Sequence, residues 1–541
     1  MLLRPPASPP WRRLGWVTVL AAAPLAYFWL IGRYGWSDTD DGFVLASGWR
    51  VHLGQTPYLD FLDVRPPVSA WLHSLWFLVL PRELVFAGAR FGAIVQVWAC
   101  SLIGTAAVLR AREGSDEGPS AMLPVALAGF LASAAAFTPM PWHTTDGVMF
   151  CAAGCALIVA RRGALPAGLA GALLLLGLGT KQSFYPMAPL ALAFLAVQRR
   201  WIEAGVMAAV MAAGAGLFAG WLTSQGALAA FLSQTSTRTG AGFIWTAGFD
   251  GYLRMGLGFA SLAGAVLAAV CLGAKALRRR LTPLMAALIV GVLALGAYGL
   301  RLRDEEGWIN ASTLGFPHAL FLAAAALAAC RASRPERRTE GLESLLFLGL
   351  AWCSSLSIGF PTPLLFMAPI LAVLAPRAGV APRWAMAAAA AAFAGLAALH
   401  PYEDLDGRPG ANCSLAHVEP ALAGIVSGPM TCRKLVEYQR FRRASPGPFL
   451  TLPGLAEGHA LLGLPSPIAA DWPTLAEDAG QSARLIAEAD ARVRWVLVER
   501  REAAAAGGDQ LMPLYDHVRA SWRPVATGEF YAVFENPRAG A

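Results

Sequence analysis

Long apolar runs separated by short polar segments fill the first 400 residues of the chain. The first run covers about 14–31, which is near the roughly 20 residues that a membrane-spanning helix needs. Further runs lie at about 87–109, 121–137, 147–160, 164–179, 184–198, 202–222, 256–274, 282–300, 313–330, 345–360, 362–375 and 384–400. The pattern predicts a polytopic α-helical membrane protein with about 13 transmembrane helices, several of them short or interrupted by Pro and Gly.

The first run resembles the apolar core of a signal peptide, because Arg12 and Arg13 precede it. No small-residue cleavage pattern closes it, and Tyr34 and Trp36 follow it as residues typical of a membrane interface. We therefore expect a retained first helix.

Composition narrows the class of protein. The chain has 541 residues, of which 56% are hydrophobic and 14% charged, and its mean hydropathy is +0.50. These values exclude a soluble multidomain enzyme. The net charge of +8 does not indicate a nucleic-acid partner, because the basic residues are scattered between apolar runs and form no continuous patch.

Charges between the runs predict the orientation in the bilayer, since short cytoplasmic loops carry an excess of Lys and Arg. Alternation through the runs places most basic loop residues on the side of the N-terminus. They are Arg110, Arg112, Arg161, Arg162, Arg199, Arg200, Lys275, Arg278, Arg279, Arg280, Arg331, Arg334, Arg337, Arg338, Arg377 and Arg383. We expect a multi-pass protein of the cell (inner) membrane with a cytoplasmic N-terminus. The first loop, at about 33–86, and the tail after 400 are then extracytoplasmic.

The last 141 residues differ from the transmembrane domain at 1–400. Apolar runs shorten, and 491–499 and 521–535 are typical of two strands around a helical segment, PLYDHVRASW. We expect 401–541 to form an extracytoplasmic soluble α/β domain. Of the eight cysteines, only Cys413 and Cys432 fall in this tail, where an oxidising compartment predicts a disulfide between them.

The first loop concentrates ionisable residues between two apolar runs. An ionisable group near hydrocarbon is costly and usually faces a protein interior or a water-filled cavity. This concentration therefore indicates chemistry. The residues are Asp38, Asp40, Asp41, Asp60, Asp63 and Arg65.

Two stretches of this loop resemble the first extracytoplasmic loop of GT-C glycosyltransferases. They are D-D-G-F (40–43) and, after a helical stretch, G-Q-T-P-Y-L-D-F-L-D-V-R-P-P (54–67). The nearest resemblance is to the family 39-like set, which includes protein O-mannosyltransferases and the lipid A aminoarabinose transferase. Its members carry an acidic pair after the first helix, P-Y-x-D, and a basic residue before Pro-Pro. H-T-T-D (143–146) and G-T-K-Q-S-F-Y-P (179–186) match more loosely.

Sugar transfer needs a base for the acceptor, cations for the departing phosphate, and a site shielded from water. Asp40 is our expected base, with Asp38 and Asp41 as alternates, because burial and like-charge proximity can raise the pKa of one carboxylate. Arg65 and Lys181 are the candidates for the donor phosphate, Arg65 being fixed by the Pro-Pro that follows it. Relative to many family members, Asp41 replaces Glu and Arg65 replaces Lys.

Four further residues are candidates for positioning the acceptor or substrate. Asp146 is the second acidic residue, with His143 beside it; a lone His three residues from an Asp is a weak metal signal, and no metal ligand is assigned. Asp60 and Asp63 flank the Pro-Pro turn, where carboxylates more often form turns than act in chemistry. Lys181 could alternatively extend its amine to the interface.

The compartment predicts the donor, because nucleotide sugars are cytoplasmic and the acidic loop faces outward. We expect a polyprenyl-phosphate sugar donor, a lipid, glycan or protein acceptor, and the lipid bilayer as a further partner. The resemblance to the GT-C family implies an inverting transfer, and a divalent metal ion stays open as a cofactor. The alternative is a transporter or flippase for an amphipathic anion. Phosphate loops, dinucleotide fingerprints, zinc spacings and nucleophile elbows are absent from the sequence, which argues against ATP-driven transport and dehydrogenase chemistry.

Overall fold

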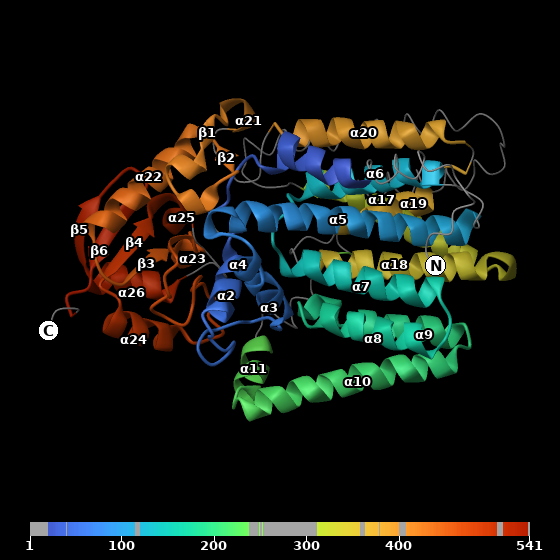
Figure 1. Ribbon diagram of the computed structural model, residues 1–541, viewed down its shortest axis with the longest axis horizontal. Coiled ribbons are helices and arrows are strands. Elements are labelled where there is room, and N and C mark those ends of the chain that lie inside the picture. Colours follow the sequence, from blue (N-terminus) through green and yellow to red (C-terminus); the bar gives the residue numbers. More distant parts are fainter. Residues whose placement is uncertain are drawn as a thin grey trace.

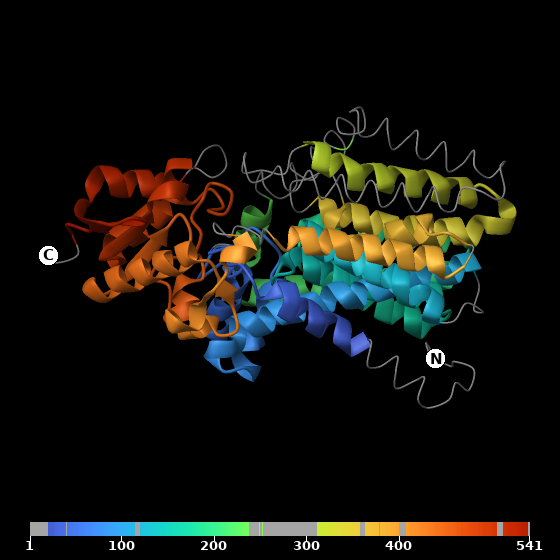
Figure 2. The same ribbon diagram turned by 90° about the horizontal axis from the view of Figure 1, so that it is seen from above.

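Helices and strands divide between two parts of the molecule. The structure, a computed structural model, describes residues 20–38, 40–113, 119–236, 248, 252, 311–356, 363–377, 379–399, 407–505 and 512–538. The described elements of residues 20–399 are helices, and we call this part the helical region. The described strands all lie in 407–538, together with further helices, and we call this part the C-terminal region. The C-terminal region caps one end of the long helices (Figure 1). Figure 2 shows the same two lobes from above.

The long helices coincide with the predicted apolar runs. An initial helix covers Leu20–Gly32. It is followed by α5 (Arg82–Glu113), α6 (Pro119–Ala136), α7 (His143–Ala160), α8 (Ala164–Leu178), α9 (Met187–Val197), α10 (Trp201–Ser224), α17 (Ala311–Ala332), α18 (Arg338–Ser355), α19 (Ala368–Leu374) and α20 (Ala381–Ala397). The predicted runs at 256–274 and 282–300 lie outside the described residues.

Three of the described helices are long enough and apolar enough to cross a bilayer. They are Arg82–Arg112, His143–Ala160 and Trp201–Ser224. Six other apolar helices are shorter, between 10 and 17 residues. The prediction of about 13 transmembrane helices is therefore not confirmed by the structure.

Small residues let the helices approach closely, as is typical of helix packing in membranes. At Gly129 of α6, an added Cβ would lie 2.6 Å from the Cα of Ala368 in α19, so only glycine fits there. The core between the helices is built from small and medium side chains such as Cys155, Ala170 and Leu350. α10 is different, because its apolar side chains face outward: Leu217 is 77% exposed. Such a surface suits lipid.

Short helices connect the two regions. α2 (Phe43–His52), α3 (Val68–Ser74) and α4 (Trp76–Val79) belong to the first loop, and α11 (Leu228–Thr235) follows α10. In Figure 1 they lie between the long helices and the C-terminal region. The first loop is therefore clamped between the two regions.

The C-terminal region is built on a four-stranded sheet of order β3-β4-β6-β5. β3 (Phe449–Leu452) runs parallel to β4 (Trp495–Glu499), whereas β6 (Tyr531–Glu535) is antiparallel to both β4 and β5 (Arg523–Thr527). The strand predicted at 521–535 is thus a hairpin, which the Thr-Gly-Glu-Phe segment turns. The remaining elements are α21 (Gly407–Gly410), β1 (Cys413–Ser414), β2 (Val426–Ser427), α22 (Pro429–Ala444), α23 (Gly458–Leu462), α24 (Ser482–Arg492), α25 (Arg500–Ala505) and α26 (Pro513–Ser521).

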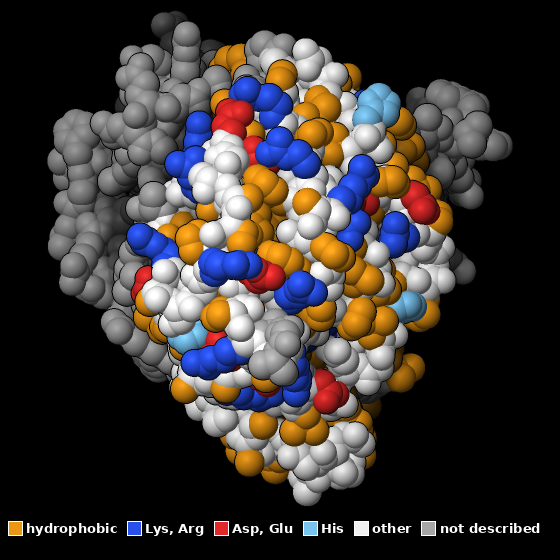
Figure 3. Space-filling view, turned by 90° about the vertical axis from the view of Figure 1, so that its left-hand side faces the viewer, with side chains coloured by type: hydrophobic (Ala, Val, Ile, Leu, Met, Phe, Trp, Pro, Cys, Tyr) orange, Lys and Arg blue, Asp and Glu red, His pale blue; other side chains and the backbone are white. Residues whose placement is uncertain are grey.

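Both faces of the sheet are covered. Leu497 and its neighbours on one face pack against Leu435 of α22, and Val496 on the other face packs against Leu485 of α24. This alternation follows from the two-residue period of a strand. The first of these clusters continues to Phe86 of α5, which joins the C-terminal region to the helices through apolar contact. The far end of the C-terminal region exposes many Lys and Arg side chains and fewer Asp and Glu (Figure 3).

Candidate functional site

The turn before α2 sets the directions of three carboxylates. The backbone N–H of Asp40 donates to the hydroxyl of Ser37 over 3.1 Å, and the N–H of Ser37 donates to Asp41 Oδ2 over 2.9 Å. An added Cβ on Gly42 would lie 2.2 Å from Cβ of Glu457, a residue of the C-terminal region. Glycine is therefore needed at this position for the two regions to meet.

Asp41 forms a buried ion pair with Arg90 of α5. The guanidinium Nε donates to Asp41 Oδ1 over 3.0 Å, and Nη2 donates to Oδ2. Nη1 donates to the carbonyls of Gly32 and Gly35 over 3.1 and 3.0 Å. Both side chains are at most 4% exposed. The pair holds the end of the first helix against α5, and it leaves Asp41 poorly placed to accept a proton from a substrate.

Asp38 contacts a lysine of the C-terminal region. Its Oδ2 lies 2.7 Å from Nζ of Lys434, which also lies 3.7 Å from Glu499. The carbonyl of Asp38 accepts a hydrogen bond from the N–H of Leu455. Asp38 thus holds the first loop against α22 and the segment after β3.

Asp40 has a different environment, because it is only partly buried and its charge acts on both predicted phosphate-binding residues. Its charge opposes the lowering of the pKa of Lys181 that burial causes, and it helps to raise the pKa of Arg65 against the effect of burial. Glu477 acts on both cations, and Asp63 acts on Arg65. We call Asp40, Asp63, Arg65, Lys181 and Glu477 the charged cluster.

Arg65 binds Glu477 of the C-terminal region through two parallel hydrogen bonds. Both N–H···O distances are 2.6 Å, which is the bidentate geometry that a guanidinium favours. The side chain also lies over the ring of Phe43, 4.9 Å from its centroid. The ring of Phe43 in turn packs against Trp472 at 5.6 Å. The guanidinium of Arg65 therefore contacts the ring of Phe43 and the carboxylate of Glu477.

Lys181 lies in the turn between α8 and the short 3-10 helix Gln182–Phe184. Two hydrogen bonds hold this turn against the first loop: the backbone N–H of Val68 donates to Gly179 O over 2.9 Å, and the side-chain amide Nε2 of Gln182 donates to Val64 O over 2.7 Å. Burial, with the nearby charge of Arg65, lowers the pKa of Lys181 to about 7, although Glu477 and Asp40 oppose the shift. Asp40, Arg65 and Lys181 thus lie close enough for their charges to act on one another, and their roles toward a donor stay predictions.

His143 and Asp146, predicted to act together, have separate partners. Asp146 is fully buried; its Oδ2 lies 3.0 Å from Nε2 of His73 and its Oδ1 accepts from Gln96 over 2.9 Å. His143 instead packs against Phe43, with 5.5 Å between ring centroids. These contacts make Asp146 a support of α3 against α7, and its role toward an acceptor stays a prediction.

Asp60 and Asp63 both accept local backbone hydrogen bonds, as turn-forming carboxylates do. Asp60 accepts from Thr56 N–H over 2.7 Å, and Asp63 from Arg65 N–H over 2.9 Å. Asp60 also lines a cavity of about 330 Å³ between the first loop and the C-terminal region, beside Arg50 and Arg492. Burial raises the pKa of Asp63 to about 7, against the opposing charge of Arg65. Asp63 therefore belongs to the charged cluster, whereas Asp60 lines the cavity beside Arg50.

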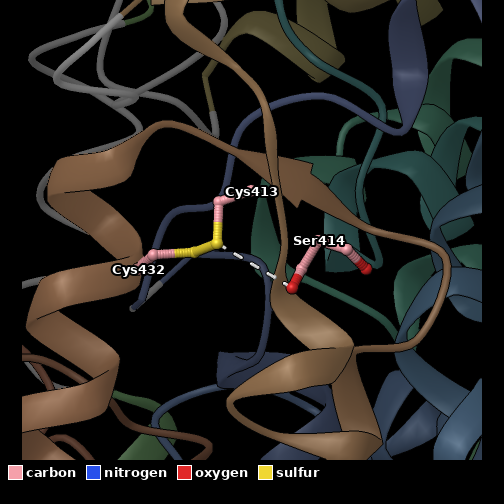
Figure 4. The surroundings of a disulfide bond; sticks show 3 residues. All are labelled: Cys413, Ser414 and Cys432. Carbon is pink, nitrogen blue, oxygen red and sulfur yellow. Dashed lines mark hydrogen bonds between the residues drawn. A yellow bond between two sulfur atoms is a disulfide. The ribbon is translucent and has the colours of Figure 1, made fainter.

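Cys413 and Cys432 form a disulfide that joins β1 to α22 (Figure 4). β1 pairs with β2, and β2 reaches the first loop: Val426 N–H donates to Arg33 O, and Gly35 N–H to Val426 O, both over 2.9 Å. The bond thus supports the segment that holds the start of the first loop.

Several residues of the site were not predicted from the sequence. Arg90 could have been found, because it is a lone cation inside the apolar run 87–109. Glu477 and Lys434 carry no such signal, since each lies about 400 positions from its partner in the first loop. Across the described part of the chain, no group of three or more His, Cys, Asp and Glu side chains could hold a metal ion.

Comparison with known proteins gives two structural neighbours. No protein-family model and no curated protein sequence matches the chain. The chain is similar to the archaeal oligosaccharyltransferase AglB from Archaeoglobus fulgidus in complex with an inhibitory peptide and a dolichol-phosphate. The TM-score is 0.43 and the identity 13%, over 98% of this chain and 75% of that one.

It is also similar to a crystal structure of the Archaeoglobus fulgidus oligosaccharyltransferase in complex with Zn and sulfate. Here the TM-score is 0.44 and the identity 14%, over 96% of this chain and 73% of that one. Both neighbours are described as oligosaccharyltransferases.

Proposed function

We propose that the chain is an integral-membrane glycosyltransferase that moves a sugar from a polyprenyl-phosphate donor to an extracytoplasmic acceptor. The observation that carries the proposal is the charged cluster, in which one partly buried carboxylate, Asp40, acts on two cations, Arg65 and Lys181. Such a cluster, enclosed between the first loop and the C-terminal region, supplies a base and a phosphate site away from bulk water.

The proposed reaction is a single displacement. The acceptor hydroxyl attacks the anomeric carbon and its proton passes to Asp40, while the bond from that carbon to the phosphate oxygen breaks. The electron pair leaves with the polyprenyl phosphate, whose charge Arg65 and Lys181 stabilise. Attack from the side opposite the leaving group inverts the anomeric centre. Asp41 and Asp38 act as positioning residues, because Arg90 and Lys434 engage them.

The proposed membrane arrangement follows the sequence. The outward-facing apolar side chains of α10 contact lipid, the C-terminal region forms an extracytoplasmic domain, and the arginine-rich ends of the helices face the cytoplasm. A lipid donor would then reach the charged cluster from the outer leaflet.

Complementation of a strain that lacks the gene tests this function. Mass spectrometry of envelope glycolipids and glycans should reveal a sugar that wild-type protein restores and Asp40→Asn does not. Loss of a general base predicts a rate about 10²–10⁴ lower. Asp516→Asn is the matched control, because this exposed carboxylate lies on α26 outside the charged cluster. Equal membrane levels of both variants establish that they fold.

Retention of transfer in Asp38→Asn, Asp40→Asn and Asp41→Asn alike would show that the chain is not this enzyme. The transporter alternative is tested in vesicles: if Asp40→Asn abolishes movement of a lipid-linked anion across the bilayer and the glycans are unchanged, the chain is a flippase.

A further inference from the structure

A second cavity lies at the other end of the helical region. It has a volume of about 310 Å³, within the range of small-molecule sites. It forms where α5 ends, α17 turns into α18, and the chain leaves α19. Its charged and polar lining consists of Arg112, Glu336, Arg337, Thr339, Glu340 and Arg377. We call it the distal cavity.

Positive charge dominates the distal cavity. Glu340 is shared by two arginines: its Oε1 lies 3.1 Å from Nε of Arg331 and 2.9 Å from Nη2 of Arg377. Three arginines of the lining, Arg112, Arg337 and Arg377, outnumber Glu336 and Glu340, so the lining has a net charge of +1. Arg331 adds one more positive charge behind Glu340. A cavity with this excess attracts an anion.

The backbone fixes the position of this charge. Arg112 donates to the carbonyls of Ala372, Val373 and Ala375 at the end of α19, so its guanidinium is held rigidly. Nη1 of Arg337 is buried and has no hydrogen-bond partner among the residues that the structure describes. A buried guanidinium N–H without an acceptor is costly, so the side chain of Arg337 has an unmet need for an acceptor.

We propose that the distal cavity binds a phosphate group, with the headgroup of an anionic phospholipid as the favoured source. The cavity lies at the ends of the long helices, on the face that the basic loops assign to the cytoplasm, where anionic headgroups gather. Basic pockets between transmembrane helices on this side suit such headgroups. The proposal needs the helices to span a membrane, but it does not depend on sugar transfer.

Thermal unfolding of the full-length protein in detergent tests the site. Phosphatidylglycerol should raise the melting temperature, and phosphatidylcholine with the same acyl chains should not. Arg337→Gln should weaken phosphatidylglycerol binding about tenfold, because one charge-assisted hydrogen bond is lost. Arg338→Gln is the matched control: it removes the same charge one residue away, from an exposed side chain outside the cavity.

A second variant separates binding from folding. Glu336→Gln removes a negative charge from the rim of the distal cavity and should tighten phosphatidylglycerol binding, an effect that general destabilisation does not produce. Equal weakening in Arg337→Gln and Arg338→Gln would overturn the proposal, as would equal stabilisation by the two lipids. If inorganic phosphate binds as tightly as the lipid and depends on Arg337, the phosphate site is supported and its source is soluble.

Discussion

Arginines lie at both ends of the helical region, but their partners differ. At the end that meets the C-terminal region, Arg65 and Arg90 bind the carboxylates of Glu477 and Asp41. At the opposite end, Arg200 donates to the backbone carbonyls of Ile158 and Arg161 and to the nearby Glu203. Glu340 at this end pairs with two arginines that lie 9 and 37 positions away, Arg331 and Arg377. An arginine at a helix end satisfies carbonyls that the helix leaves open. The comparison teaches that an arginine alone does not mark the candidate site. The site is distinguished by carboxylates, such as Glu477, that come from segments far away in the sequence.

The largest expected effect separates Asp41 from Asp40. Asp41→Asn leaves Arg90 buried beside a neutral partner, and breaking such a pair costs about 3–5 kcal/mol. We expect a much lower melting temperature in detergent for Asp41→Asn, and a melting temperature close to wild type for Asp40→Asn. If both substitutions destabilise the protein equally, the distinction between a structural and a chemical carboxylate is wrong.

The disulfide should contribute somewhat less. Cys413 and Cys432 are separated by 19 positions, and a loop of this size predicts about 3 kcal/mol. Cys432→Ser should lower the melting temperature of the C-terminal region and loosen β2 at the start of the first loop. A labelling assay for free thiols provides the check: both cysteines should be unreactive in native protein and reactive after reduction.

At the opposite end, loss of an arginine should affect folding alone. Arg200→Gln removes charge-assisted hydrogen bonds to carbonyls at the end of α7, which are worth about 2 kcal/mol. Arg162→Gln is the control, because this side chain is exposed. Sugar transfer per folded molecule should be unchanged in both variants. A loss of transfer in Arg200→Gln at equal folded protein would contradict the separation of the two ends.

The smallest effect concerns pH. Burial holds the pKa of Lys181 near 7, below its ordinary 10.5, so the amine is charged below pH 7 and becomes neutral as the pH rises. Affinity for a phosphate-linked donor should therefore fall above pH 7, by at most about tenfold per unit. Measured KM for the donor should rise from pH 7 to 9 in wild type and stay flat in Lys181→Arg, whose guanidinium remains charged. A parallel rise in both proteins would remove Lys181 from the phosphate site.

The pattern of apolar runs predicted the long helices well. A run such as 202–222 forms α10 from its own local sequence, without contacts that come from distant segments. The pattern also grouped Asp40, Arg65 and Lys181, since each lies at the same end of its span. Their charges act on one another in the structure, and their roles stay predictions. The partners of Arg65 and Asp38 could not be found in this way. Glu477 and Lys434 belong to polar segments with many similar residues, and only tertiary packing selects them. The hairpin of β5 and β6 was missed because its turn is short.

The bidentate contact between Arg65 and Glu477 has a consequence for how a substrate would enter. A guanidinium whose two forward N–H groups already hold a carboxylate must exchange that ligand before a phosphate can take both positions. Arrival of the donor would then release Glu477, and with it one tether of the C-terminal region. Binding of the donor would therefore be coupled to a weaker contact between the C-terminal region and the first loop.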